Sequence, residues 1–396
     1  MIEVIKSTGP SEQPRWSPLA LGFRPFFFAA GWIAVLLMLI FVGSYSTQEW
    51  QGNYFDFQFW HAHEMLFGFS VAVIAGFLLT AARNWTGLPT PTGNMLGLLV
   101  GLWLTPRLLS AVPLIPAPLF AILDMLFLPA LAFALFKVLH KADQKRNYIL
   151  PAILMLMGAV NMAVHLEILG VVEDIARPAM QLMLNLIVVL IVLMAGRVVP
   201  FFIGSAVGRR PETITVVERF AIASAFLFAA TELIVPDTWL SAVVAIAVAV
   251  LHALRLKSWY QPGLWQQPML WVLYLAYGWL VIGFFLHALA DMMLIERVHA
   301  MHAFTIGAIS TIAMGMMARV SLGHSGRRVQ ALPWMPAAFI LLMLASFIRV
   351  VLPLLWPDNM ELIIHAAGCC WVVAFIIFGI RYSAILMRPR TDGQPG

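Results

Sequence analysis

The sequence predicts an all-α polytopic membrane protein, a bundle of about twelve transmembrane helices with both termini in the cytoplasm. Of its 396 residues, 62% are hydrophobic and only 11% are charged, and long apolar stretches follow one another along the chain. Soluble domains carry about 25% charged residues, and a membrane-spanning helix needs roughly 20 apolar residues. The composition therefore excludes a soluble domain and intrinsic disorder.

Twelve apolar stretches qualify as membrane spans. They cover residues 26–45, 60–82, 94–112, 115–139, 149–170, 178–203, 217–235, 238–256, 267–290, 299–319, 333–355 and 361–387. The chain then divides into a cytoplasmic N-terminal segment (1–25), a transmembrane helical domain (26–387) and a cytoplasmic tail (388–396). No short apolar segment with a cleavage site precedes the first span, so we expect no removable signal peptide.

The distribution of basic residues supports this division, because cytoplasmic loops of membrane proteins are enriched in Lys and Arg. With the N-terminus inside, only Arg107, Arg177, Arg297 and Arg349 of the 24 basic residues fall in outer segments. A missed or extra helix would mix the two groups. The formal net charge of +5 therefore reports membrane orientation, and no nucleic-acid partner is expected.

Seven of the ten histidines fall in one layer near the predicted outer surface. They are His61, His63, His165, His287, His299, His302 and His365. Ionisable side chains in membrane helices are costly and by default mark functional sites, and imidazole is a common ligand of haem iron and copper. All seven are therefore candidate metal ligands. For His165, His287 or His365 taken singly, a hydrogen bond to a backbone carbonyl explains the residue equally well.

Four of these histidines open two spans. His299 and His302 are three residues apart, so on a helix they share a face and can serve one site. His61 and His63 are two apart and point to different sides of a regular helix. Either the first turn is irregular or the two belong to different sites.

A weak internal repeat relates the second and tenth spans. His63, Gly68, Gly76 and Gly87 match His302, Gly307, Gly315 and Gly326 at a constant offset of 239. We therefore expect the two spans to be structurally equivalent and the four histidines His61, His63, His299 and His302 to converge in space. The remaining three outer histidines are expected to line the same cavity.

The residue types around these histidines favour haem b and copper. A helix bundle supplies the apolar slot that haem needs, and the four outer arginines, Arg107, Arg177, Arg297 and Arg349, are candidate cations for its propionates. Met65 and Met301 add thioethers, which suit Cu(I). The predicted haem residues are therefore His61, His63, His299, His302, Arg107 and Arg297. The sequence contains neither the HExxH motif of zinc proteases nor the His-His and His-Pro-Glu pattern of haem–copper oxidases.

Several stretches resemble the NnrS family of bacterial membrane proteins. They are Gly22-Phe23-Arg24-Pro25-Phe26-Phe27, Trp60 to Phe69, Arg83-Asn84-Trp85-Thr86-Gly87, and His302 through Arg319 to Arg327. The resemblance implies a twelve-helix protein of the bacterial inner (cytoplasmic) membrane that binds haem and copper. It further implies a part in the nitric oxide response of denitrification and in protection from nitrosative stress, with nitric oxide as the small-molecule ligand. It implies no ligand assignment and no particular reaction.

Two other functions are compatible with the same topology. A secondary transporter also has twelve spans with both ends inside, but transporter sites lie near the bilayer midplane, whereas this histidine layer lies at one surface. A membrane enzyme that oxidises quinol would be favoured by a second haem near the inner face. The inner histidines, His140, His252 and His324, are too few and scattered to indicate one.

Overall fold

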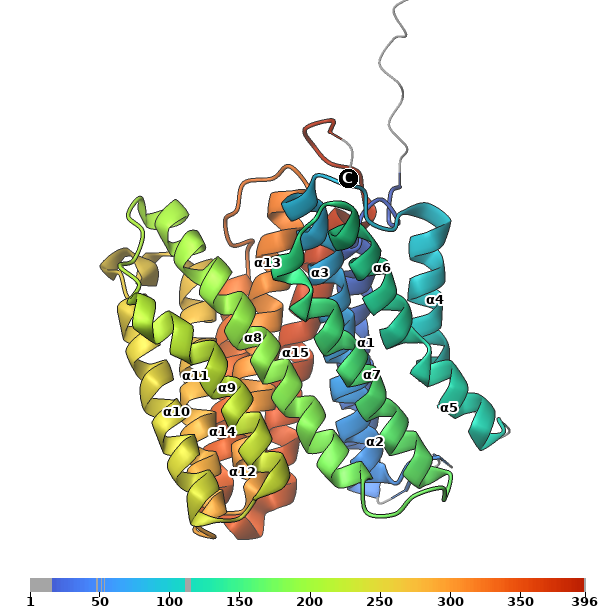
Figure 1. Ribbon diagram of the computed structural model, residues 1–396, viewed down its shortest axis with the longest axis vertical. Coiled ribbons are helices and arrows are strands. Elements are labelled where there is room, and N and C mark those ends of the chain that lie inside the picture. The colour runs from blue at the N-terminus through green and yellow to red at the C-terminus, as the bar shows by residue number, and fades with distance from the viewer. Residues whose placement is uncertain (1–15, 48, 51, 53, 111–114, 395–396) are drawn as a thin grey trace, which may run out of the picture.

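The computed structural model describes residues 16–47, 49–50, 52, 54–110 and 115–394, and these ranges form a bundle of long helices without strands (Figure 1). The α-helices are α1 (Phe23–Thr47), α2 (Phe57–His63), α3 (Val71–Thr86), α4 (Gly93–Leu109), α5 (Ala117–Met125), α6 (Phe127–Lys141), α7 (Ile149–Ile168), α8 (Ala176–Val207), α9 (Thr215–Ile234), α10 (Trp239–Ser258), α11 (Pro268–Asp291), α12 (Arg297–His302), α13 (Thr311–His324), α14 (Met335–Leu355) and α15 (Met360–Met387). Two π-helical segments, η1 (Glu64–Ser70) and η4 (Ala303–Ser310), join α2 to α3 and α12 to α13. The short 3₁₀ segments are η2 (Lys145–Asn147), η3 (Pro262–Gln266) and η5 (Pro357–Asn359).

Each predicted span coincides with one helix or with a run of consecutive helices. Among the described residues, ten of these spans are long and apolar enough to cross a membrane; α4 and α9 are the two predicted spans outside that set. The prediction of an all-helical polytopic membrane protein is confirmed. Residues 1–15 of the predicted N-terminal segment and 111–112 of the predicted third span lie outside the described residues.

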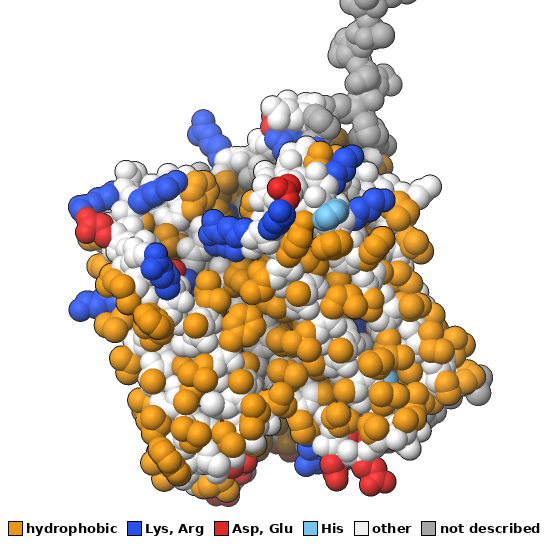
Figure 2. Space-filling view, viewed as in Figure 1, with side chains coloured by type: hydrophobic (Ala, Val, Ile, Leu, Met, Phe, Trp, Pro, Cys, Tyr) orange, Lys and Arg blue, Asp and Glu red, His pale blue; other side chains and the backbone are white. Residues whose placement is uncertain are grey.

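The two ends of the described chain meet at one end of the bundle. The Ser17 amide donates to the Met387 carbonyl at 2.9 Å, and the Arg24 guanidinium donates to the Ile385 carbonyl at 3.2 Å. Most Lys and Arg side chains on the face in Figure 2 gather at the end where Figure 1 marks the C-terminus, above a broad hydrophobic band. This charge asymmetry supports the predicted cytoplasmic side, which stays a prediction.

Spans two and ten share a local irregularity that supports their predicted equivalence. In each, a short α-helix ends at a histidine, His63 or His302, and a π-helical segment follows at once. The Ser70 hydroxyl donates to the Met65 carbonyl at 2.8 Å, and the Ser310 hydroxyl donates to a carbonyl five residues earlier at 2.7 Å. Such π-turns occur frequently at functional sites.

The fourth span is broken at Leu126, between α5 and α6. Pro129 explains the break, because proline has no amide hydrogen for the carbonyl four residues earlier and its ring clashes with that carbonyl. The break leaves Asp124 in the last turn of α5, inside the span. α5 packs on α4, α6 and α7. Elsewhere in the bundle, α7 packs on α6 and α8, and α1 packs on α3 and α15.

At the other end of the bundle, a glycine on α8 makes room for an ion pair between α10 and α9. Arg255 Nη2 lies 2.5 Å from Glu218 Oε2, and a Cβ added at Gly196 would lie 1.9 Å from the same nitrogen.

We expect Gly196→Ala to destabilise the protein by about 1–3 kcal/mol through overpacking, lowering Tm in detergent. Gly101→Ala is the control, because a Cβ there meets nothing within 4 Å. Equal melting of the two variants would contradict the prediction.

Candidate functional site

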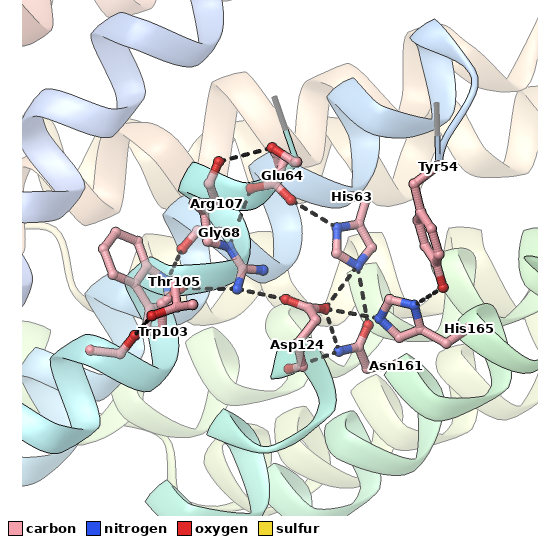
Figure 3. Close-up of polar contacts among 12 residues, drawn as sticks. Tyr54, His63, Glu64, Gly68, Trp103, Thr105, Arg107, Asp124, Asn161 and His165 are labelled. Carbon is pink, nitrogen blue, oxygen red and sulfur yellow. Dashed lines mark hydrogen bonds and ion pairs between the residues drawn. The ribbon is translucent and has the colours of Figure 1, made fainter. Parts of the chain in front are cut away.

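Asp124 is surrounded by polar side chains from three other spans (Figure 3). His63 ends α2, Arg107 comes from α4, and Asn161 and His165 come from α7. All five residues are buried, and the histidines have no exposed surface. A carboxylate inside a membrane span must find partners within the protein, and these four side chains supply them.

Three potential ligand atoms in this cluster converge on one point. The group formed by His63, Asp124 and His165 offers ligand atoms that all lie within 4.8 Å of one another. Asp124 Oδ2 lies 3.0 Å from His165 Nε2 and 3.4 Å from His63 Nε2. Two imidazoles and a carboxylate are a set of protein ligands that leaves positions open on a transition metal. We call these three residues the His-Asp-His cluster.

The remaining ring nitrogens of both histidines are held by second partners. His63 Nδ1 lies 3.1 Å from Glu64 Oε1, and His165 Nδ1 lies 2.7 Å from the Tyr54 hydroxyl. Metal-binding histidines use their other nitrogen in this way, which fixes the tautomer and the ring orientation. Burial raises the pKa of Tyr54, in the loop before α2, and the charge of Asp124 raises it further. The hydroxyl therefore stays protonated, and its oxygen can accept a hydrogen bond from Nδ1–H when Nε2 binds a metal.

Arg107 ties the two carboxylates together. Its Nη1 lies 2.6 Å from Asp124 Oδ1, and its Nε lies 3.2 Å from Glu64 Oε2. Asn161 donates to Asp124 Oδ2 at 2.8 Å. One guanidinium between two buried carboxylates leaves one negative charge when both are ionised. Buried charges are paired or coordinate metals, so the cluster favours one more positive charge, which either a protonated His63 between the two carboxylates or a bound metal ion can supply.

A second candidate site is a cavity of about 120 Å³ between spans two and ten. Its walls include His61, Met65, Met301, His302 and Arg349, with Phe41 and Trp371 as aromatic walls. His302 Nδ1 donates to a backbone carbonyl at 2.7 Å, so its Nε2 can accept. His61 Nδ1 and Arg349 Nη1 are buried and have no hydrogen-bond partner among the described residues. We call this space the His61–His302 cavity.

The expectation that four histidines share one site is corrected by this arrangement. His61 and His302 line the cavity, whereas His63 faces the His-Asp-His cluster. The physical reason is that α2 is regular from Phe57 to His63, and residues two apart on a regular helix point to different sides. His299 is buried, its Nδ1 has no partner among the described residues, and it is not among the residues that line the cavity.

The other outer histidines occupy separate places. His165 joins the His-Asp-His cluster. His287 donates from Nδ1 to the Gly283 carbonyl at 2.9 Å and stacks on Phe304. His365 Nε2 lies 2.5 Å from the Ser46 hydroxyl. Neither His287 nor His365 is among the residues that line the His61–His302 cavity, so the expectation of one shared cavity is corrected as well.

Two of the arginines predicted to meet haem propionates already face carboxylates. Arg107 belongs to the buried cluster, and Arg297 lies 2.5–2.6 Å from Glu232, Asp237 and Asp291. Arg349 is the arginine that lines the cavity. Arg349 is one of the four outer arginines that the sequence offers as cations for haem propionates. Asn161 and Tyr54 carry no pattern of their own, and sequence reasoning missed them.

Fold and site together define a polytopic helical membrane protein with a buried cluster of metal-ligand type. The family model described as NnrS protein matches residues 17–390, nearly the whole chain. The chain belongs to the NnrS family, and the resemblance seen in the sequence is confirmed. No curated protein matches the chain. Family membership supports a haem- and copper-type membrane protein of the nitric oxide response.

The tyrosine beside His165 offers a test of the His-Asp-His cluster. Tyr54→Phe removes the partner of His165 Nδ1 without touching a ligand atom. Loss of such a partner typically costs 10–100-fold in metal affinity. We therefore expect the variant to lose its metal at a chelator concentration roughly 10–100-fold lower than the wild type requires, as measured by elemental analysis.

The matched control is Tyr148→Phe, whose hydroxyl lies 3.0 Å from Nδ1 of the inner histidine His140. It should bind metal as the wild type does. Equal retention in the two variants would show that Tyr54 does not support a metal ligand.

Proposed function

We propose that this protein binds copper at the His-Asp-His cluster and haem at the His61–His302 cavity, and that the two groups serve nitric oxide tolerance. The observation that supports the proposal best is the convergence of His63, Asp124 and His165 within 4.8 Å in the buried interior. Family membership adds the haem, the copper and the nitric oxide response. The role of each residue is our assignment.

Copper suits the cluster by the chemistry of its donors. Imidazole nitrogens and a carboxylate oxygen favour Cu(II) in tetragonal sites, and the same donors accept iron or zinc. A divalent ion would compensate the negative charge that Arg107 leaves on Asp124 and Glu64. Asp124 and both histidines would hold the ion, while Glu64 and Tyr54 would orient the imidazoles.

The His61–His302 cavity contains imidazole nitrogens of the kind that ligate haem iron. Two imidazoles come from different spans, and the walls are apolar. Arg349 provides a guanidinium whose Nη1 has no partner among the described residues, which suits a propionate. With only one of the two imidazoles as its ligand, the bound haem iron would supply an open position at which a diatomic gas binds.

The size of the cavity sets a condition on this assignment. Pockets that enclose cofactor-sized ligands measure roughly 300–1,000 Å³, and this cavity measures about 120 Å³. Haem binding therefore requires Met38, Met65 and Met301 in its walls to move aside. Methionine suits this role, because its unbranched side chain adapts readily.

The test is a set of single histidine variants of the purified protein, measured by optical spectrum and by metal analysis. His165→Ala should lose copper and keep the haem spectrum, and His302→Ala should do the reverse. His140→Ala is the control and should keep both. Adding nitric oxide to the reduced wild type should shift the Soret band.

The nitric oxide tolerance of cells distinguishes this proposal from a function in transport. Cells with His165→Ala or His302→Ala should lose nitric oxide tolerance, while His140→Ala cells keep it. Full tolerance with a well-expressed protein that lacks both groups would overturn the proposal and favour a secondary transporter.

Two arginines at the far ends of spans two and ten provide a further prediction. The Arg319 guanidinium lies 4.1 Å from the Phe202 ring centroid, and Arg83 lies in the last turn of α3. We expect both to act in topology and helix packing, so Arg83→Lys and Arg319→Lys should keep the haem spectrum. Loss of haem from either folded variant would place that arginine in the haem site.

A further inference from the structure

A third cavity lies at the opposite end of the same helices, where α3, α8 and α13 meet. It measures about 340 Å³, and its walls include Asn84, Trp85, Arg197, Phe201, Phe202 and His324. The positive-inside pattern assigns this end to the cytoplasmic leaflet. None of its lining residues belongs to the His-Asp-His cluster or lines the His61–His302 cavity.

Hydrogen-bonding groups gather on one side of this cavity. Asn84 Nδ2 lies 3.3 Å from His324 Nε2, so the two side chains form one polar edge. Arg197 donates from Nη1 to Asn147 Oδ1 at 2.7 Å, which fixes its guanidinium beside the Trp85 ring at 6.0 Å. In the contact between Asn84 and His324, the amide donates and His324 Nε2 accepts, so the imidazole orients the amide. The edge therefore presents the second amide hydrogen of Asn84 and the Arg197 guanidinium as donors to a ligand that carries oxygen acceptors.

The rest of the cavity leads into apolar space. A neighbouring cavity of about 90 Å³ shares Phe77, Met194 and Val198 with it. Ser70 is the only residue with a polar side chain in that second lining. The two spaces adjoin at these shared residues, so a polar pocket near one membrane surface lies beside an apolar slot deeper in the bundle.

We propose that these adjoining cavities bind an isoprenoid quinone, with the ring in the larger cavity and the start of the tail in the smaller one. The larger volume lies within the roughly 300–1,000 Å³ of ligand pockets. Aromatic walls suit a planar ring, and the donors suit its two carbonyl oxygens. This inference does not depend on the metal sites.

A phospholipid is the competing occupant, and the wall chemistry disfavours it. Phosphate is recognised by several cations or by forked guanidinium contacts. Arg197 is the only Arg or Lys that lines either cavity, and one of its nitrogens is already bonded to Asn147.

The experiment titrates decylubiquinone into the full-length protein in phosphatidylcholine nanodiscs and follows quenching of tryptophan fluorescence. We expect saturable binding in the wild type. Asn84→Ala and His324→Ala should each weaken it by about two- to tenfold, the worth of one hydrogen bond. Ala81→Phe, which fills the larger cavity, should abolish it, while the inner-face control His140→Ala should bind as the wild type does.

Two results would overturn the inference. One is unchanged binding in the Ala81→Phe and His324→Ala variants. The other is a tightly held phospholipid, seen by mass spectrometry, that is absent from Ala81→Phe and that quinone does not displace. Metal and haem analysis of the same samples keeps the two proposals apart. Quinone binding without metal would refute only the metal sites, and metal without quinone binding would refute only this inference.

Discussion

The burial of Asp124 is the interaction on which this end of the bundle depends. An ionised carboxylate is too costly to leave unpaired inside a membrane span. Arg107, His63, His165 and Asn161 meet it from α4, α2 and α7. One side chain thereby fixes the positions of four spans, and the same contacts bring two imidazoles to one point.

Local backbone features place these groups at the required depth. Pro129 breaks the fourth span at Leu126, which puts Asp124 at a helix end. The π-helical turn after His63 brings Gly68 under Glu64, where an added Cβ would lie 3.0 Å from Glu64 Oε2. The Gly68 carbonyl also accepts from Trp103 Nε1 at 2.9 Å. Span two is thus irregular where it contacts α4, and this contact holds Arg107 near both carboxylates.

Sequence patterns were sufficient to predict the membrane spans, but not to predict which side chains contact one another within the sites. Apolar length and the asymmetry of Arg and Lys are properties of each segment, so they predict the helices from composition alone. The partner of Asp124 depends on how α4, α5 and α7 pack, and no periodicity encodes that. The spacing of His61 and His63 was compatible with two sites, because residues two apart on a regular helix point to different sides. The choice between that division and an irregular turn required the backbone of α2, which is regular.

The position of α8 gives the two ends of the protein a physical connection. Three residues along this helix line the three cavities. Leu184 lines the His61–His302 cavity, Ile187 lines the apolar cavity of about 90 Å³, and Met194 lines both that cavity and the larger one of about 340 Å³. The helix is 32 residues long and contains Pro200 near the larger cavity, where proline removes an internal hydrogen bond and favours a kink. The stretch from Leu184 to Met194 precedes that proline, so one regular helical segment contributes to the walls of all three cavities.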